Sequence, residues 1–416
     1  MSKEKRISTL ILIILAGFCY AVLYHYILGV YLGKGYPYNT FLFVPIDRFS
    51  DFYRVLQANE SLNPYFGPKR MFQYPFLNFL GFIFSLMPLP YAILTFTLIV
   101  TGFMIVACLY CLKIKGQPTN WTNVFILSLL TFPFLFDIDR GNFDGIIFIF
   151  LTIFMFFFTK EKFILSAIFL SFAIAMKPFP AVFLLLFIAE RKFKETLLAI
   201  ISTAFVSLIP LLSFQGGLLA NLSAALSISK FPDAIGRSGY FESNIFVFHS
   251  LSMFAMFKAY FIETGIIQRV DMAAFSSLYV KGVMLAFILI GLYVIFLEKE
   301  LWKRVAVLSI VMVIFPQISG NYRLLYMFVP LFLFLIKKTT SKSDYFYTVL
   351  LGLLLIPKNY YFLPHIITDG GWDFSISYPI NFIIMVLMLL SIILTGALKF
   401  KGIPSVKKNK LTKTSG

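Results

Sequence analysis

The sequence has little charge for its length. Asp, Glu, Lys and Arg make up 13% of its 416 residues, whereas soluble domains carry about 25%. Hydrophobic residues make up 59% of the chain, and 52 residues are Phe. A chain of this composition cannot cover a globular surface with polar side chains, which excludes a soluble domain. Its long apolar runs, rather than short alternating segments, predict helices that cross a bilayer.

Cysteine and histidine are scarce as well. Cys19, Cys108 and Cys111 all lie in apolar runs, and no histidine or second cysteine pair accompanies the C-x-x-C spacing of the last two. We therefore interpret them as packing residues rather than as a metal or redox site. The sequence contains no Walker loop, no G-x-S-x-G elbow and no G-x-G-x-x-G, so nothing in it supports ATP-driven or serine-hydrolase chemistry.

The apolar runs predict an all-α polytopic membrane protein with about 10–12 transmembrane helices. The first run is about 20 residues long and lacks a small-residue cleavage site, so we expect it to remain as a helix. We place the spans at residues 7–30, 90–112, 121–137, 143–158, 163–176, 179–190, 195–214, 276–297, 303–319, 322–336, 345–357 and 379–399.

The net charge of +17 follows this topology. With a cytoplasmic N-terminus, the inner segments hold 22 Lys and Arg against 7 acidic residues, and the outer segments hold 14 against 12. The inner excess is what the positive-inside rule requires. We therefore assign the basic residues to topology and to anionic lipid headgroups, not to nucleic acid. The expected location is a bacterial inner (plasma) membrane, with both termini cytoplasmic.

A single transmembrane domain is expected over residues 1–400, followed by a basic cytoplasmic tail at 401–416. Residues 31–89 form a first outer loop that proline breaks repeatedly. This loop ends in an apolar run too short to span the bilayer, which we interpret as an interfacial helix. Residues 215–275 form a second large outer loop.

The first outer loop carries an acid in the stretch Ser50-Asp51-Phe52-Tyr53. One interpretation is that Ser50 or Asp51 is the N-cap of a short helix. The other is that Asp51 is a general base at the membrane boundary, taking the proton from an acceptor hydroxyl as it attacks a sugar carbon. Asp47 competes for this role, with Arg48 as its neighbouring cation.

A second polar cluster lies between two apolar spans, at residues 137–144. Asp137 and Asp139 form an Asp-x-Asp pair whose oxygens could hold a divalent cation. A turn closed by a salt bridge to Arg140 explains the same residues. The cluster is expected on the same membrane face as Asp51.

Several cations are expected on the outer face, where the positive-inside rule does not place them. Lys177 lies in a tight turn before Pro178, and Arg323 follows Asn321-Tyr322. Snorkelling to the interface explains such a lysine. The alternative is that Lys177 and Arg323, with Lys69-Arg70, contact a phosphate or diphosphate.

These landmarks follow one another in a recognisable order over residues 5–340. The order is Ser50-Asp51-Phe52-Tyr53, Leu62-Asn63-Pro64-Tyr65, Tyr74-Pro75-Phe76, Gly141-Asn142-Phe143-Asp144, Lys177-Pro178 with the basic segment ERKFK, and Glu242-Ser243-Asn244. In this order the chain resembles the GT-C superfamily of polyprenyl-phosphate-sugar-dependent glycosyltransferases, specifically the mannosyltransferase-like glycosyltransferase family 87. It departs from the family pattern at Asn142, which replaces Gln, at Phe76, which replaces Pro, and at Arg323, in a late loop that often carries His.

The resemblance implies a GT-C-like helical bundle with outer-face loops and interfacial helices. It also implies that Asp51 is the catalytic base for inverting transfer, from a lipid-monophosphate sugar to an envelope glycan or glycolipid acceptor at the outer leaflet. The donor phosphate is then expected at Lys177, Arg323 and Arg140. The residues expected to contact substrate are Tyr53, Tyr74, Asn142 and Asn244.

Two other functions fit a chain with many spans. An O-antigen-type polymerase or ligase would carry paired Arg and His in a large late outer loop, whereas here the first outer loop holds the largest concentration of polar residues. A lipid-linked glycan flippase or another transporter would place charges in mid-helix around a central binding site. The acids of this chain cluster at outer helix ends, which favours the glycosyltransferase.

Overall fold

The structure, a computed structural model, describes residues 1–42, 47–59, 63–66, 74–114, 116–230, 250–361, 363–367 and 373–400. It is almost entirely helical. Short 3₁₀ or π-helical segments are labelled η. The helices are α1 (Lys3–Tyr26), η1 (Ile27–Tyr31), α2 (Ser50–Ala58), α3 (Pro75–Ser85), α4 (Leu89–Leu112), α5 (Trp121–Leu129), α6 (Phe132–Arg140), α7 (Asp144–Thr159), α8 (Phe163–Met176), η3 (Phe179–Phe183), α9 (Leu184–Ala189), α10 (Phe193–Ser213), α11 (Gly217–Lys230), α13 (Met253–Glu263), η5 (Ile267–Arg269), α14 (Met272–Leu292), η6 (Tyr293–Leu297), α15 (Leu301–Ile314), η7 (Asn321–Met327), α16 (Phe328–Ile336), α17 (Asp344–Leu355) and α18 (Ser377–Phe400). Two short strands, β1 (Leu363–Ile367) and β2 (Asp373–Phe374), pair antiparallel.

Each of the twelve predicted spans contains helix, which confirms the all-α polytopic architecture, but most of these helices are short. By length and composition, five qualify as spans within the described residues: Lys3–Tyr31, Leu89–Leu112, Phe193–Ser213, Met272–Leu297 and Ser377–Leu398. The pair α5 and α6, bent by 53°, would make a sixth. The predicted count of about 10–12 is therefore higher than the number of long helices.

Local breaks explain the difference. An apolar run in the sequence does not reveal where a helix changes its hydrogen-bonding pattern. The predicted span at 179–190 is split into η3 and α9, and the one at 322–336 into η7 and α16. Even the continuous α7, at 16 residues, is only about 24 Å long, less than the roughly 30 Å of a hydrocarbon core.

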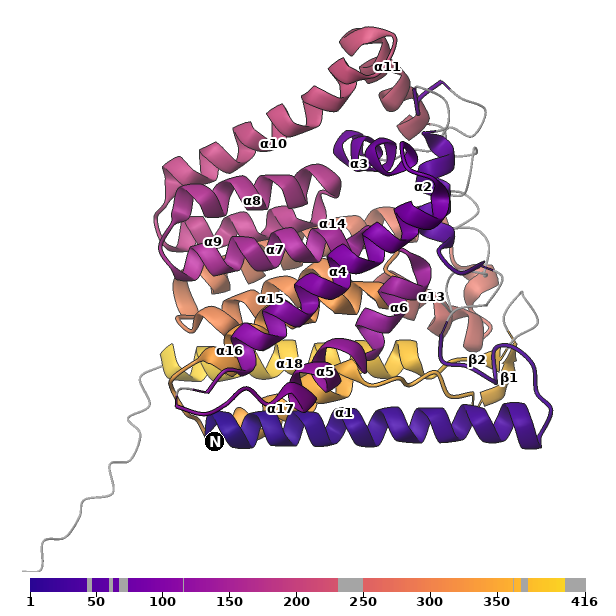
Figure 1. The fold of residues 1–416 in the computed structure, drawn as a ribbon, viewed down its shortest axis with the longest axis vertical. Helices are drawn as coiled ribbons and strands as arrows, with labels where there is room; N and C mark the ends of the chain where they lie inside the picture. The colour runs from indigo at the N-terminus through magenta and orange to yellow at the C-terminus, as the bar shows by residue number, and fades with distance from the viewer. Residues whose placement is uncertain are drawn as a thin grey trace, which may run out of the picture.

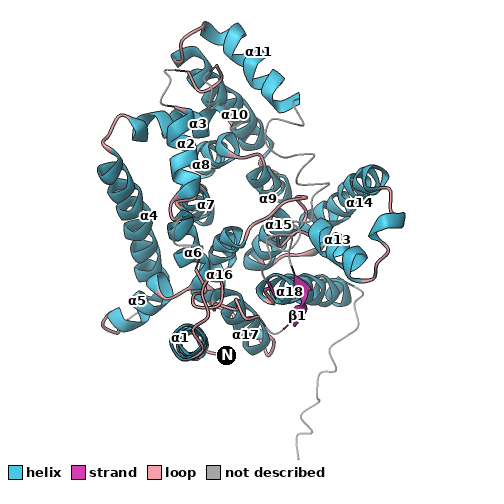
Figure 2. Cartoon of the chain, turned by 90° about the vertical axis from the view of Figure 1, so that its right-hand side faces the viewer, coloured by secondary structure: helices cyan, strands magenta, loops and turns pink. Residues whose placement is uncertain are grey.

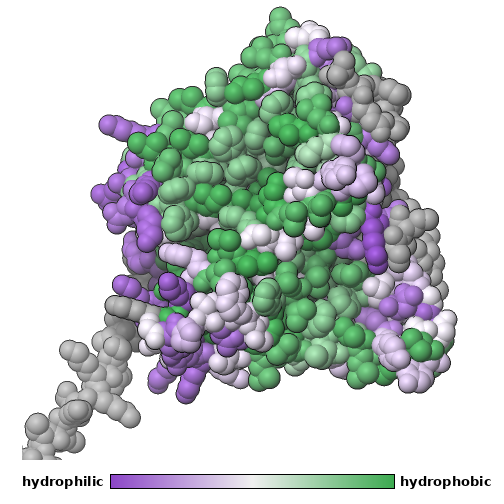
Figure 3. Space-filling view, in the orientation of Figure 1, coloured by the Kyte–Doolittle hydropathy of each residue, from purple (hydrophilic) through white to green (hydrophobic). Residues whose placement is uncertain are grey.

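The helices cross the molecule between two ends of different character (Figure 1). The end at the left of Figure 1, here called the basic end, carries residues 1–6, 113–114, 116–120, 160–162, 190–194, 298–303 and 337–343. The opposite end, here called the site end, carries α2, α13, β1 and β2. Figure 3 shows hydrophilic residues gathered along the basic end and an apolar surface across the middle. This surface is the part that a bilayer would cover.

The centre of the bundle is formed by α7, α15 and α16. Phe148 and Phe154 of α7 have no exposed surface, and every residue of α15 from 302 to 314 is buried. By contrast, only 17% of the best apolar window of α10 or of α14 is buried. The central helices therefore hold the bundle together, and α10 and α14 lie at its margin.

At the basic end, a buried ion-pair network joins α1, α16 and α17. The Nζ of Lys337 donates to an Asp344 oxygen at 2.6 Å, and an Arg6 nitrogen lies 3.5 Å from the other oxygen. Arg6 is 1% exposed and also donates to the Lys337 carbonyl at 3.0 Å. Charges this deeply buried are stable only when they are paired, so Asp344 fixes the packing of three helices.

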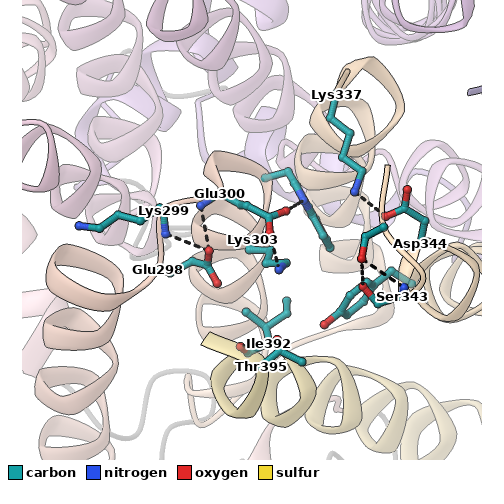
Figure 4. Close-up of polar contacts among 12 residues, drawn as sticks. Glu298, Lys299, Glu300, Lys303, Lys337, Ser343, Asp344, Ile392 and Thr395 are labelled. Carbon is teal, nitrogen blue, oxygen red and sulfur yellow. Dashed lines mark hydrogen bonds and ion pairs between the residues drawn. The ribbon is translucent and has the colours of Figure 1, made fainter. Parts of the chain in front are cut away.

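A second set of polar contacts continues the network along the start of α15 (Figure 4). Glu300 accepts from Lys303 Nζ at 2.8 Å and from the Trp302 indole N–H at 3.0 Å. Glu298 accepts from the backbone N–H groups of Lys299 and Glu300 and from the Tyr293 hydroxyl. The same hydroxyl is 2.8 Å from the carbonyl of Ile392 in α18, so the network reaches the last helix.

Replacing Asp344 by Asn should destabilise the protein by about 3 kcal/mol, because Arg6 and Lys337 would stay buried without a carboxylate. Thermal unfolding of purified protein in detergent measures the loss. The matched control is Lys299→Gln, which removes an exposed charge at the same end and should change stability by less than about 0.5 kcal/mol. Equal effects of the two substitutions would contradict this role of Asp344.

Lys358 anchors the loop that follows α17. Its Nζ donates to the carbonyls of Leu353 and of Ile356, so it caps the last turn of α17. The neighbouring Asn359 donates to the carbonyl of Phe41 at 3.0 Å. The loop therefore ties α17 to the segment that follows η1. Burial lowers the pKa of the Lys358 ammonium from 10.5 to about 7.

This pKa makes stability depend on pH. Between pH 7 and 10.5 the unfolded chain binds more protons at Lys358 than the folded protein does, so its contribution to stability rises with pH over that interval. Lys358→Met removes the dependence. Because the variant also loses the hydrogen bonds to Leu353 and Ile356 at every pH, the expected result is a change in the difference from wild type: the variant should become less stable relative to wild type as the pH rises from 7 to 10, by roughly 4 kcal/mol at most. Unfolding temperatures measured across this range test it, with the exposed Lys281→Met as control; a constant difference would contradict it.

Candidate active site

Asp51 reaches the site because α2 begins in an unusual way. Its N-cap position is occupied by Phe49, whose φ of 55° lies in the left-handed region and whose N–H donates to the carbonyl of Asp139 at 2.8 Å. No side chain caps this helix, so the N-cap interpretation of Ser50 or Asp51 is wrong. Phe52 has no exposed surface and packs its ring against those of Phe84, Phe96 and Phe143. This packing fixes the orientation of α2.

The Asp51 carboxylate is held by two side chains from the turn between α6 and α7. Arg140 donates to both oxygens, with Nε at 3.1 Å from Oδ2 and the second nitrogen on Oδ1. The Asn142 amide donates to Oδ2 at 2.6 Å. A bidentate pair with a further amide donor fixes a carboxylate in one orientation. The Asp51 side chain keeps 21% of its surface exposed, so it remains open to a reactant.

The turn itself depends on Gly141. Its φ of +60° ends α6 in the left-handed conformation that favours glycine. A Cβ at this position would lie 2.8 Å from the Cβ of Phe52, so glycine also permits the close approach of α2. The next residue, Asn142, accepts from the backbone N–H of Asp144 at 3.0 Å. One asparagine thus connects Asp51 with the first turn of α7.

Asp144 is the centre of a second ion-pair group. It has no exposed surface, and one of its oxygens lies 2.5 Å from Lys177 Nζ. The Nε of Arg323 lies 3.9 Å from the other oxygen. Arg323 also stacks over the ring of Phe179, 4.4 Å from its centroid, and donates to the Ile318 carbonyl. Two cations thus share one carboxylate, which leaves one positive charge in excess within the group.

Tyrosines lie between and beside the two groups. Tyr322 interacts electrostatically with Asp51, Asp144, Arg140 and Arg323, and its ring is 5.8 Å from Lys177 Nζ. The two ion-pair groups are therefore adjacent. Burial raises the pKa of the Tyr36 hydroxyl to about 12, and Arg140, Asp139 and Asp47 are among its charged neighbours. Tyr36 accordingly stays protonated at neutral pH and can donate a hydrogen bond.

The remaining predicted site residues lie in different surroundings. Asp47 is exposed, and its expected partner Arg48 lies 3.5 Å from Asp139 instead. Tyr53 is half-buried on α2, and Tyr74 occupies the position before α3. Asn244, together with the Lys69-Arg70 pair and the sequence Glu242-Ser243, lies outside the described residues.

The predicted Asp-x-Asp cation site is divided between two environments. Asp137 is fully buried against α7, where a Cβ on Gly145 would come 2.6 Å from its Oδ2. Asp139 faces Arg48. Within the described residues, no group of three or more His, Cys, Asp or Glu side chains could hold a metal ion. A divalent cation at Asp137 and Asp139 stays a prediction.

The sequence did not reveal that Asp144 is the centre of an ion-pair group. The residue was visible in the polar cluster at 137–144, but its pairing with Lys177, 33 positions later, leaves no pattern in the sequence. The involvement of Tyr36 and Tyr322 was missed as well, because single tyrosines between apolar runs carry no distinguishing signal.

The model of glycosyltransferase family 87 matches residues 72–319, more than half of the chain. The chain belongs to glycosyltransferase family 87. It is therefore a glycosyltransferase, and its apolar helices make it a multi-pass membrane protein. A comparison with curated proteins finds no match.

The family 87 match contains the acid turn and Lys177, whereas Asp51 and Arg323 lie outside it. In the structure, both of these residues lie next to residues inside the matched range: Asp51 contacts Arg140 and Asn142, and Arg323 approaches Asp144. The candidate site of this glycosyltransferase therefore consists of residues inside and outside the matched range.

The substitution Asn142→Asp should lower the rate of glycosyl transfer at least about tenfold. The new carboxylate still accepts from the Asp144 N–H, but it faces Asp51 at hydrogen-bonding distance, and like charges repel. The measurement is kcat in proteoliposomes. Asn120→Asp is the matched control, because the Asn120 side chain also accepts from a backbone N–H at the start of a helix, that of Asn123 in α5, and lies at the basic end. Equal rates for the two variants would contradict the importance of the Asp51–Asn142 contact.

Proposed function

We propose that this protein transfers a sugar from a polyprenyl-phosphate donor to a hydroxyl group of an envelope glycan or glycolipid, with inversion at the anomeric carbon. The observation that carries the proposal is the juxtaposition of a fixed carboxylate, Asp51, with two cations, Lys177 and Arg323, at one end of a membrane bundle. A lipid-phosphate donor needs a base for the acceptor and positive charge for the leaving phosphate. No nucleotide site is required.

Asp51 is the general base of the proposed reaction. The acceptor oxygen attacks the anomeric carbon from the side opposite the phosphate, its proton passes to the Asp51 carboxylate, and the bond from the sugar to the phosphate oxygen breaks. Arg140 and Asn142 hold the carboxylate in place during this step, which reduces the orientational cost of proton transfer. A single displacement of this kind inverts the anomeric configuration.

Lys177 and Arg323 bind the phosphate of the donor in this proposal. They share Asp144, so their combined positive charge exceeds that of their partner by one. A phosphate near them would be attracted by the excess, and the charge that develops on the leaving group would be stabilised in a largely buried site. Arg140 was also predicted at the phosphate. The Arg140 guanidinium is bound to Asp51, and we propose that it contacts the donor phosphate as well.

The site end is proposed to face the periplasm. Figure 3 shows hydrophilic residues gathered at the opposite end, and the segments at that end are rich in Lys and Arg. The positive-inside rule assigns such an end to the cytoplasm. Lipid-linked donor and acceptor would then meet on the outer leaflet of a bacterial inner membrane. Membership of a glycosyltransferase family favours this function over a flippase.

The test is sugar transfer in proteoliposomes supplied with labelled polyprenyl-phosphate hexoses and pentoses, with UDP- and GDP-sugars as the alternative donors. Asp51→Asn should lower kcat by about 10²–10⁴-fold while the unfolding temperature stays within a few degrees of wild type. Asp47→Asn is the matched control and should retain activity. Full activity of Asp51→Asn would exclude it as the base, and transfer from the nucleotide sugars alone would exclude the lipid donor.

A further inference from the structure

An apolar cavity lies near the basic end, within the membrane part of the bundle and away from the residues of the candidate site. It has a volume of about 370 Å³ and is lined by three helices, and this volume is within the range of ligand-binding pockets. The lining includes Phe103 and Ala107 from α4, Thr152 and Phe156 from α7, and Phe332 and Ile336 from α16.

The cavity exists because α4 approaches α7 only towards the site end. There, Gly145 lets the two helices meet, since a Cβ on it would lie 3.0 Å from a methyl of Val100. The Phe148 ring then packs against those of Phe103 and Phe332, with centroids 6.1 and 6.3 Å apart. These rings close the cavity on the side of the catalytic residues. Figure 2, drawn from the site end, shows α4 at the edge of the bundle.

The cavity opens sideways, onto the surface that faces the bilayer. Three residues of its rim are substantially exposed: Val106 by 62%, Tyr110 by 51% and Phe156 by 40%. The rings of Tyr110 and Phe156 meet edge to face at 5.6 Å across the opening. Water needs two to four polar partners in such a place, and the lining is almost wholly apolar. A hydrocarbon chain therefore fits this cavity better than water does.

The charge beside the opening selects the headgroup. Lys160, which follows α7 directly, is exposed, and its Nζ lies 6.0 Å above the ring of Phe156. Lys113 at the end of α4 and Lys162 are exposed on the same end of the bundle. Lysine stems extend along apolar surface and hold the ammonium at the membrane boundary, where it attracts anionic lipid.

We propose that this cavity binds one acyl chain of an anionic phospholipid, whose headgroup lies at Lys160. The bound chain would fill the space between α4 and the pair α7–α16, and so support the helix whose first residue is Asp144. The proposal is independent of the donor assigned above, because the packed rings of Phe103, Phe148 and Phe332 separate the cavity from the catalytic residues.

Native mass spectrometry and thermal unfolding of delipidated protein test the proposal, with phosphatidylglycerol and phosphatidylcholine as probes. Wild type should retain phosphatidylglycerol and unfold at a higher temperature with it than with phosphatidylcholine. Ala107→Phe, which fills the cavity, should lower the lipid-bound fraction at least about fivefold. Leu98→Phe is the matched control on an exposed part of α4 and should bind as wild type does.

A second pair of variants tests the headgroup without altering the core. Lys160→Gln should remove the preference for phosphatidylglycerol, whereas Lys299→Gln, an exposed lysine at the same end that is not part of the cavity lining, should keep it. Equal retention of the two lipids by wild type, or unchanged binding by Ala107→Phe, would overturn the proposal. So would retention of polyprenyl phosphate in preference to phosphatidylglycerol, because the cavity would then belong to the donor.

Discussion

The ion pair between Asp51 and Arg140 is the contact on which the site depends. It joins α2 to the turn between α6 and α7, and Arg140 lies 89 positions after Asp51 in the chain. Both side chains are partly buried, and a charge near a bilayer is costly unless it is paired. This helix is therefore fixed against the bundle by the group that also carries the proposed chemistry. The same turn reaches Asp144 through Asn142, so the orientation of the carboxylate and the position of the cations are linked.

The same constraint shapes both ends of the molecule. At the site end, charges are paired around Asp51 and Asp144; at the basic end they are paired around Asp344 and Glu300. Between the two ends the central helices are held mainly by apolar and aromatic packing. Polar groups are thus concentrated where water or headgroups are near, which is the arrangement expected when unpaired charge in the hydrocarbon is too costly to keep.

Helix packing is not uniformly tight between these ends. Close approach at Gly145 brings α4 against α7 near the site, and the two helices separate towards the basic end, where the apolar cavity lies. A soluble protein would lose stability to such a void. In a membrane, lipid chains are available to fill it, so the requirement for internal packing is relaxed where the cavity opens to the bilayer.

Composition and apolar run length were sufficient to predict an all-α polytopic membrane protein, because burial in a bilayer demands long apolar helices whatever their arrangement. They were not sufficient for the number of spans. The breaks before α9 and α16 depend on backbone hydrogen bonding inside the bundle, and the run of apolar letters continues through them.

The sequence by itself determined the class of protein. It also identified the candidate site residues, because charged and polar groups are few in an apolar chain: Asp51, Arg140, Asn142, Lys177 and Arg323. Only the tertiary structure decided how they pair. It placed Asp51 on Arg140 and Asn142 rather than at a helix cap, and it made Asp144 the shared partner of Lys177 and Arg323. The physical reason is that pairing depends on distances of a few ångströms between helices far apart in the chain, and no local pattern records those distances.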